Sequence, residues 1–152
     1  MTLLEVNNLG KTYTTRFGGN KVEALKNISF SVDSGEYVAI MGESGSGKTT
    51  LLNILAALDR PSSGSVLLNG DDLTSIKESE ISIFRRENLG FVFQDFNLLD
   101  TFSLADNILL PLVLAGVPYN DMRQRLDPIA AKLRIHKLLA KFPYEVSGGE
   151  KQ

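Results

Sequence analysis

Several residue types and patterns are absent from this sequence of 152 residues, and each absence excludes a class of function. The chain contains no cysteine, so disulfides and thiolate metal sites are excluded. Lys and Arg number 16 and Asp and Glu number 18, which gives a formal charge of -2. The basic excess that phosphate-backbone binding usually requires is therefore missing, and we expect no nucleic acid among the main partners.

Long hydrophobic runs are also absent. The longest apolar run, 108–117, is about half of the ~20 residues that a membrane-spanning helix needs, and Pro111 interrupts it. The N-terminal segment carries Glu5 and no basic stretch leading into an apolar run, so we expect no signal peptide. A hydrophobic fraction of 43% and a charged fraction of 22% are typical of a globular domain with a core of its own.

The apolar patterns predict strands and helices in a definite order. Segments 3–9, 22–32 and 89–93 are expected to be strands, and 63–73 is expected to contain a short strand closed by the turn dipeptide Asn69-Gly70. The continuous apolar run YVAIM, 37–41, is typical of a strand buried on both faces in a parallel sheet. Helices are expected over 50–58, 75–88 and 103–141, with a kink or a new helix at Pro128. We therefore expect an α/β body followed by a mainly helical arm.

The segment GESGSGKTT, 42–50, joins the expected strand YVAIM to the expected helix. It fits the pattern G-x-x-x-x-G-K-[ST], in which glycines allow the positive φ angles that turn backbone N–H groups inward around phosphate. Lys48 is expected to reach the β- and γ-phosphates, and the Thr49 hydroxyl to bind Mg²⁺. The competing interpretation is a glycine-rich turn that happens to contain a lysine. We expect the nucleotide to contact Gly42, Glu43, Ser44, Gly45, Ser46, Gly47, Lys48, Thr49 and Thr50.

A second glycine-containing segment, VSGGEKQ, spans residues 146–152. Together with the glycine loop and with Gln94 in FVFQDFNLL, it resembles the ATPase subunits of ABC transporters in order and approximate spacing. In detail the chain looks most like the subfamily that powers macrolide and antimicrobial-peptide efflux and lipoprotein release. Two signature positions depart from the family pattern, because Val146 replaces the usual leucine and Glu150 the usual glutamine.

The resemblance implies why one chain carries two such segments. In this family two ATPase subunits face each other head to tail, and the signature of one closes over the ATP held in the loop of the other. The signature residues expected to contact ATP are Ser147, Gly148, Gly149 and Glu150. Taken alone, VSGGEKQ would be a polar surface turn.

Three further features take their roles from the resemblance. Tyr13 matches the aromatic residue that stacks on adenine, with Phe17 as the second candidate; packing of a strand-end tyrosine on the sheet remains an equal alternative. Gln94 matches the glutamine that touches Mg²⁺ and the attacking water. The segment from Asp95 to Leu112, with its large apolar residues, is expected to dock on a membrane permease subunit, and burial within the helical arm is the competing interpretation.

The resulting expectation is an α/β P-loop NTPase of the ABC ATPase type, with an N-terminal antiparallel sheet and a helical subdomain. Residues 1–152 form one domain, with 1–94 as the nucleotide-binding body and 95–152 as the helical arm. The family's strand with the catalytic glutamate, and its switch histidine, normally follow the signature. We therefore expect residues 1–152 alone to be inactive in hydrolysis and their signature to be disordered.

The expected function is that of an ATP-binding subunit at the cytoplasmic face of the plasma membrane, which uses ATP to drive export or release of a substrate through a separate membrane subunit. Two alternatives stay open at this point. One is an ABC ATPase of DNA repair or chromosome maintenance, and the other is a P-loop kinase. The apolar residues after Gln94 speak against the first, and a kinase would not need residues 147–152.

Overall fold

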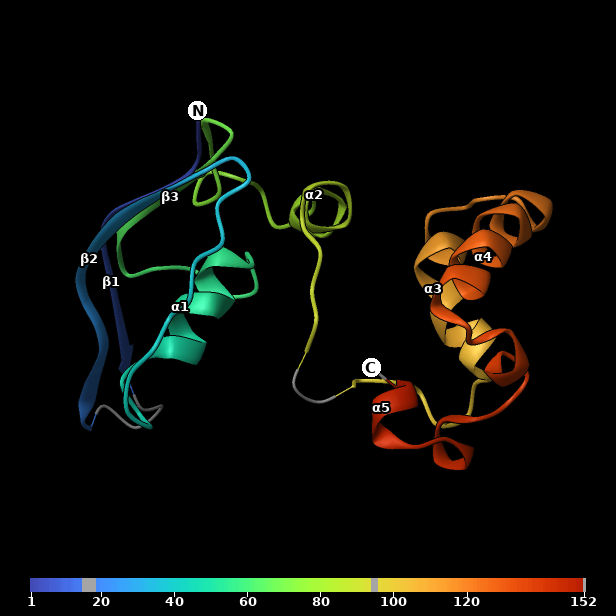
Figure 1. The fold of residues 1–152 in the computed structure, drawn as a ribbon. Helices are drawn as coiled ribbons and strands as arrows, with labels where there is room; N and C mark the ends of the chain where they lie inside the picture. The colour runs from blue at the N-terminus through green and yellow to red at the C-terminus, as the bar shows by residue number, and fades with distance from the viewer. Residues whose placement is uncertain (15–18, 94–95, 152) are drawn as a thin grey trace. The chain divides into compact units, whose positions relative to one another are not determined.

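The structure, a computed structural model, describes residues 1–14, 19–93 and 96–151. The chain divides into two compact units, Met1–Gly90 and Phe91–Gln152. Strands are confined to the first unit, and the described part of the second unit is helical (Figure 1). Each unit is described by itself below.

An antiparallel sheet forms the framework of the N-terminal unit. It consists of β1 (Thr2–Thr14), β2 (Lys21–Asp33), β3 (Ser63–Leu68) and β4 (Asp71–Asp72), in the order β2-β1-β3-β4. The central strand β1 pairs with β2 along its whole length and with β3 between Leu4 and Gly10. The predicted antiparallel N-terminal sheet is confirmed, and the predicted strands 3–9 and 22–32 lie within it. Segment 63–73 contains β3 and β4 with a turn at Asn69 and Gly70 between them, as predicted for that dipeptide.

Two helices belong to the same unit, α1 (Lys48–Leu55) and α2 (Ile81–Asn88). Helix α1 turns Leu51 and Ile54 toward the sheet, as Figure 1 shows for the helix as a whole. Phe84 of α2 packs against the same cluster. Burial of apolar surface between sheet and helix is the main stabilising contribution here. The buried members of this core are Val6, Leu9, Leu25, Leu51, Ile54, Val66, Leu68 and Leu73.

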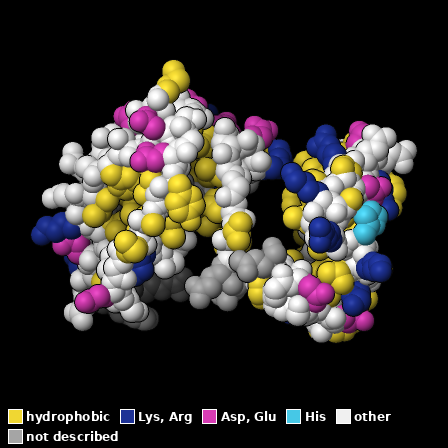
Figure 2. All heavy atoms as spheres, in the orientation of Figure 1, with side chains coloured by type: hydrophobic (Ala, Val, Ile, Leu, Met, Phe, Trp, Pro, Cys, Tyr) yellow, Lys and Arg dark blue, Asp and Glu magenta, His cyan; other side chains and the backbone are white. Residues whose placement is uncertain are grey.

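The predictions of strands at 37–41 and 89–93 are wrong for this structure. Neither segment is a strand, Tyr37 is 95% exposed, and Val92 is exposed as well. A buried parallel strand needs hydrogen-bonded neighbours on both sides, and within the described residues the only sheet is the antiparallel one. Exposed hydrophobic side chains are accordingly visible on one face of the N-terminal unit in Figure 2.

The C-terminal unit is a small helical body. It contains α3 (Leu104–Leu114) and α4 (Tyr119–Leu133), the 3-10 turns η1 (His136–Leu138) and η2 (Pro143–Glu145), and α5 (Gly148–Lys151). Helix α3 starts at a capping box in which Ser103 and Asp106 satisfy each other's backbone N–H groups. The predicted helical arm is confirmed, although α4 runs on through Pro128 instead of starting anew there. Its core consists of Leu109, Met122, Leu126, Ala130 and Leu139.

Helix α4 continues through Pro128 because its apolar residues are buried on both sides of the proline. A proline inside a helix removes one backbone hydrogen bond, at a cost of about 3 kcal/mol. The apolar residues Met122, Leu126 and Ala130 of α4 are nevertheless all buried against the unit's core, and this shared burial holds the helix together on both sides of the proline. No helix within residues 1–14, 19–93 and 96–151 is long and apolar enough to cross a membrane.

Candidate nucleotide-binding site

The glycine loop takes a backbone path that its glycines make possible. Gly45 and Gly47 have φ angles of 84° and 90°, in the left-handed region that L side chains rarely adopt. A Cβ atom at Gly47 would also collide with the carbonyl oxygen of Ala24 and lie 2.9 Å from Cδ2 of Leu25, both on β2. Conformation and space therefore both require glycine at 47, and they hold the loop against β2.

Helix α1 begins at this loop with its N–H groups available. Gly47 is the N-cap, no side chain within the described ranges caps the helix, and its first turn has no acidic residue. The N–H of Leu51 donates to the carbonyl oxygen of Gly47 at 2.9 Å, so the preceding amides of the first turn have no partner inside the helix. Unpaired amides and the helix dipole together favour an anion at this point.

Lys48 supplies the positive charge of the loop. Its Nζ donates to the carbonyl oxygens of Gly42 at 2.7 Å and Glu43 at 2.6 Å, so the ammonium group is folded back over the loop. Ser46 Oγ lies 3.4 Å from the same nitrogen. These partners are neutral oxygens, which an anionic phosphate can replace because a charge-assisted hydrogen bond is stronger than one to a carbonyl.

The predicted magnesium ligands are only partly within the described residues. The Thr49 side chain is exposed on the first turn of α1, next to Lys48, which suits a hydroxyl ligand for a hard cation. Gln94, predicted as a metal ligand and as the residue that contacts the attacking water, lies outside the described residues. Phe17, the second candidate for base stacking, does so too.

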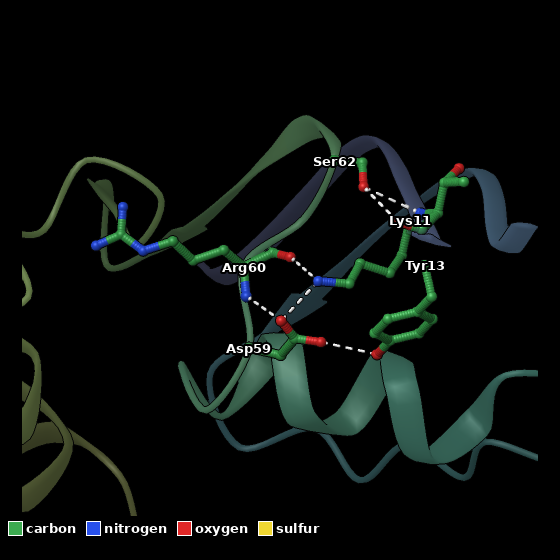
Figure 3. A network of polar contacts seen from close by, with 6 residues as sticks. Lys11, Tyr13, Asp59, Arg60 and Ser62 are labelled. Carbon is green, nitrogen blue, oxygen red and sulfur yellow. Dashed lines mark hydrogen bonds and ion pairs between the residues drawn. The ribbon is translucent and has the colours of Figure 1, made fainter. Parts of the chain in front are cut away.

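Tyr13 lies near the end of β1 in a polar network with Lys11 and Asp59 (Figure 3). Its hydroxyl donates to Asp59 Oδ2 at 2.7 Å, and Lys11 Nζ lies 4.8 Å from the centroid of its ring. Partial burial raises the pKa of Asp59, but hydrogen bonds from Lys11, Tyr13 and the N–H of Arg60 outweigh it and leave the pKa below 3.8. Asp59 is therefore ionised at neutral pH.

The register of the sheet connects this network to the glycine loop through β2. Gly47 contacts β2 at Ala24 and Leu25, and Leu25 pairs directly with Lys11 on β1. Tyr13 is two residues further along β1, on the same face as Lys11. The structure thus connects two predicted elements, the loop and the tyrosine, through neighbouring strands, and it adds Lys11 and Asp59 beside Tyr13. Sequence reasoning missed both, since only the alternation of Lys11 and Tyr13 along the strand hints at a shared face.

The signature residues form a capped helical turn in the C-terminal unit. Ser147 donates its N–H and its Oγ hydrogen to Glu150 Oε2, at 2.8 and 2.7 Å. Hydrogen bonds from the backbone and side chain of Ser147 lower the pKa of Glu150 below its usual value of 4.5. The prediction of a disordered signature is wrong here, because the side chain of Glu150 caps α5 from within and offsets the cost of starting a short helix.

The predicted docking segment divides into exposed and buried residues. Leu99 is 45% exposed, and Phe96, Phe102 and Ile108 are exposed to a similar degree, whereas Leu104 and Leu109 are buried. Asn107 fixes the exposed part, since it accepts from the N–H of Leu99 at 2.8 Å and donates to the carbonyl oxygens of Leu99, Phe102 and Ser103. Burial within the helical arm therefore holds for Leu104 and Leu109, and docking through the exposed residues stays a prediction. Asp95 lies outside the described residues.

Comparison with known proteins decides the family. A model of the family described as ABC transporter matches residues 25–152. The chain belongs to the ABC transporter family. The predicted resemblance is confirmed.

Two curated relatives are similar over the whole chain. The ABC transporter ATP-binding protein YxdL of Bacillus subtilis is 52% identical over 99% of this chain and 57% of its own length. The bacitracin export ATP-binding protein BceA of Halalkalibacterium halodurans is 46% identical over 100% of this chain and 59% of its own. The chain thus spans somewhat under three fifths of the length of these relatives. Bacitracin export agrees with the predicted similarity to antimicrobial-peptide exporters.

A solved structure confirms the predicted fold class. The ATP-binding cassette MJ0796, in a dimeric post-hydrolysis state bound to ADP and Pi, superimposes with a TM-score of 0.86 and 33% identity, covering 98% of this chain and 65% of that one. The fold is therefore that of an ABC ATPase cassette. Relatives named as transporter ATP-binding proteins support the transport interpretation and give no support to a DNA-repair ATPase or a kinase.

Proposed function

We propose that this chain binds Mg-ATP at the glycine loop and that the protein containing it couples ATP binding and hydrolysis to export through a separate membrane subunit. The observation that carries the proposal is the loop itself. Three features converge there: the left-handed glycines, the uncapped start of α1, and the Lys48 ammonium group held only by neutral oxygens. Such a combination favours a polyanion over any neutral ligand.

Each residue of the site then has a role in binding ATP. The first-turn amides of α1 bind phosphate oxygens, Lys48 moves from the loop carbonyls to the β- and γ-phosphates, and Tyr13 stacks on the base. Thr49 and Gln94 hold Mg²⁺, and Gln94 also contacts the attacking water. A bound Mg²⁺ supplies neutralisation of charge that develops on the phosphates.

The test is the affinity of Lys48→Ala for Mg-ATP, measured by calorimetry. Loss of a charge-assisted contact is expected to cost about 1.5–3 kcal/mol, which corresponds to roughly 10- to 150-fold weaker binding. Lys77→Ala is the matched control, because Lys77 is an exposed lysine of the same unit. Equal affinities of Lys48→Ala and the parent would refute the proposed site.

The partner proposed for the signature is a second copy of the ATPase subunit. In that arrangement Ser147, Gly148 and Gly149 contact the γ-phosphate of ATP held in the loop of the other subunit, and Glu150 lies beside this contact. The dimeric cassette MJ0796 supports this proposal by similarity. Because ADP lacks the γ-phosphate, contact with that group would favour a closed dimer more strongly with ATP than with ADP alone.

The membrane subunit is proposed to dock on the exposed apolar part of segment 96–112, at the cytoplasmic side of the plasma membrane. Leu99→Asp should abolish co-purification of the full protein with its membrane subunit while leaving ATP affinity unchanged. Leu133→Asp is the control, because Leu133 on α4 is even more exposed than Leu99, and this variant should co-purify normally. Loss of co-purification in both variants, or in neither, would argue against this surface.

A further inference from the structure

Asp59 binds both Lys11 and Tyr13, and it has no role in the ATP site proposed above. Both carboxylate oxygens of Asp59 accept hydrogen bonds: Oδ1 from Lys11 Nζ at 2.6 Å and from the N–H of Arg60 at 2.7 Å, and Oδ2 from the Tyr13 hydroxyl at 2.7 Å. Figure 3 shows the phenol and the ammonium group converging on this one carboxylate. The Lys11 side chain is only 12% exposed, so its charge is largely shielded from solvent.

The carboxylate is itself fixed to the central strand. Its loop, 59–62, follows α1 and bonds to β1 at two more points, since the Ser62 N–H donates to the Gly10 carbonyl at 2.8 Å and the Thr12 N–H donates to Ser62 Oγ at 3.0 Å. Lys11 Nζ also donates to the carbonyl oxygen of Arg60 at 2.6 Å. A loop tied at several points gives Asp59 little freedom to move.

This arrangement fixes the ring of Tyr13 at its tip and along one face. The hydroxyl is anchored by an ionised carboxylate, and the Lys11 ammonium group lies over the ring, while the residue as a whole remains 42% exposed. A side chain near a strand end otherwise samples several rotamers, and ordering it on binding reduces affinity. The exposed remainder of the ring is thus presented in one orientation.

We propose that Asp59 is a positioning residue for nucleotide recognition, which holds Tyr13 and Lys11 so that the ring is ready to stack on a nucleobase. This inference rests on the proposed ATP site. It assigns to Asp59 an effect on the base alone, because the phosphates contact the loop and α1. The competing role is a purely structural one, in which Asp59 only ties 59–62 to β1.

The experiment compares two ligands that differ in the base. Calorimetry on the full protein measures the affinities of Mg-ATP and of magnesium tripolyphosphate for the parent and for Asp59→Asn. We expect ATP to bind about three- to ten-fold more weakly to the variant, from loss of preorganisation, and tripolyphosphate to bind within about two-fold of the parent. Asp71→Asn, an exposed acidic residue of the same unit, is the control for the change in net charge.

Two more variants show whether the effect passes through the ring. Tyr13→Ala should weaken ATP binding roughly ten-fold or more and leave tripolyphosphate unchanged. Asp59→Asn added to Tyr13→Ala should have no further effect on ATP. Tyr13→Phe removes only the hydroxyl and should reproduce the loss seen with Asp59→Asn, which keeps the test decisive if Asp59→Asn does not fold.

Three results would overturn the inference. Asp59→Asn could weaken both ligands equally, it could weaken ATP just as much when Tyr13 is alanine, or Tyr13→Phe could bind ATP like the parent. Failure of the proposed ATP site is a separate result. It would appear as unchanged binding of both ligands by Lys48→Ala, whereas the inference fails on its own if Lys48→Ala loses both ligands and the Asp59 and Tyr13 variants lose neither.

Discussion

The glycine loop and the signature both place glycines at the start of a helix, yet they satisfy that start differently. At α1 no side chain in the described structure caps the helix, and the nearby charge is the positive one of Lys48. At α5 the carboxylate of Glu150 already accepts from the N–H and hydroxyl of Ser147. The N-terminus of α1 can therefore bind an external anion, whereas the N-terminus of α5 already has the carboxylate of Glu150 beside it.

Glycine content by itself therefore does not define a phosphate site. What distinguishes the two segments is the residue placed to interact with the helix start, a lysine in one and a glutamate in the other. Phosphate binding at the signature has to displace Glu150 or accept a second negative charge beside it. The signature is thus the weaker of the two anion sites when each unit is considered alone.

The largest expected effect on stability comes from replacing the glycines at the two helix starts. Gly47→Ala should lower the free energy of unfolding by about 2–4 kcal/mol, since it adds strain at a left-handed φ and a collision with β2. Gly149→Ala should change it by less than about 1 kcal/mol, because a Cβ there meets nothing within 4 Å and alanine favours a helix. Urea denaturation measures both.

Gly45→Ala separates the two causes at Gly47. Gly45 has a similar φ of 84° but open space around it, so only backbone strain of about 1–2 kcal/mol is expected. Equal losses for Gly45→Ala and Gly47→Ala would mean that contact with β2 does not contribute.

A smaller effect is expected from neutralising the carboxylate of Glu150 in the signature. Glu150→Gln should tighten ATP-dependent self-association of the full protein by about two- to ten-fold, because Ser147 then exchanges a neutral partner for phosphate. Sedimentation velocity with a non-hydrolysable ATP analogue measures this. Glu145→Gln, an acidic residue near the signature but outside it, is the control. Weaker self-association of Glu150→Gln would contradict the displacement argument.

The smallest effect concerns pH. In an NMR titration of carboxyl carbons, Asp59 should titrate below 3.8 and Glu150 below 4.5, and Tyr13→Phe should raise the midpoint of Asp59 alone. Because the folded pKa of Asp59 is lowered, its contribution to stability is present above 3.8 and is lost as the pH falls through the lowered value. An unchanged Asp59 midpoint in Tyr13→Phe would show that the phenol does not stabilise the carboxylate.

The sequence predicted those parts of the site that are local in the chain. The glycine loop, its lysine and the helix after it follow from neighbouring residues, and so do the antiparallel strands. Asp59 escaped prediction because its partners Lys11 and Tyr13 are brought to it only by the pairing of β1 with β3. Tyr37 and its neighbours were predicted to be buried because apolar character was taken as burial, which also needs a hydrogen-bonded partner for the backbone.

The position of β1 between β2 and β3 has a consequence for how the unit folds. The β1–β2 pair closes across the short connection between Thr14 and Lys21, whereas β1–β3 pairing closes a far longer stretch that includes the glycine loop and α1. Loop closure becomes more costly with length, so we expect β1 and β2 to associate first and the nucleotide site to be assembled last. Pulse-labelled hydrogen exchange would then find amides of β1 and β2 protected before those of β3 and α1, and a nucleotide added during refolding could accelerate only the final step.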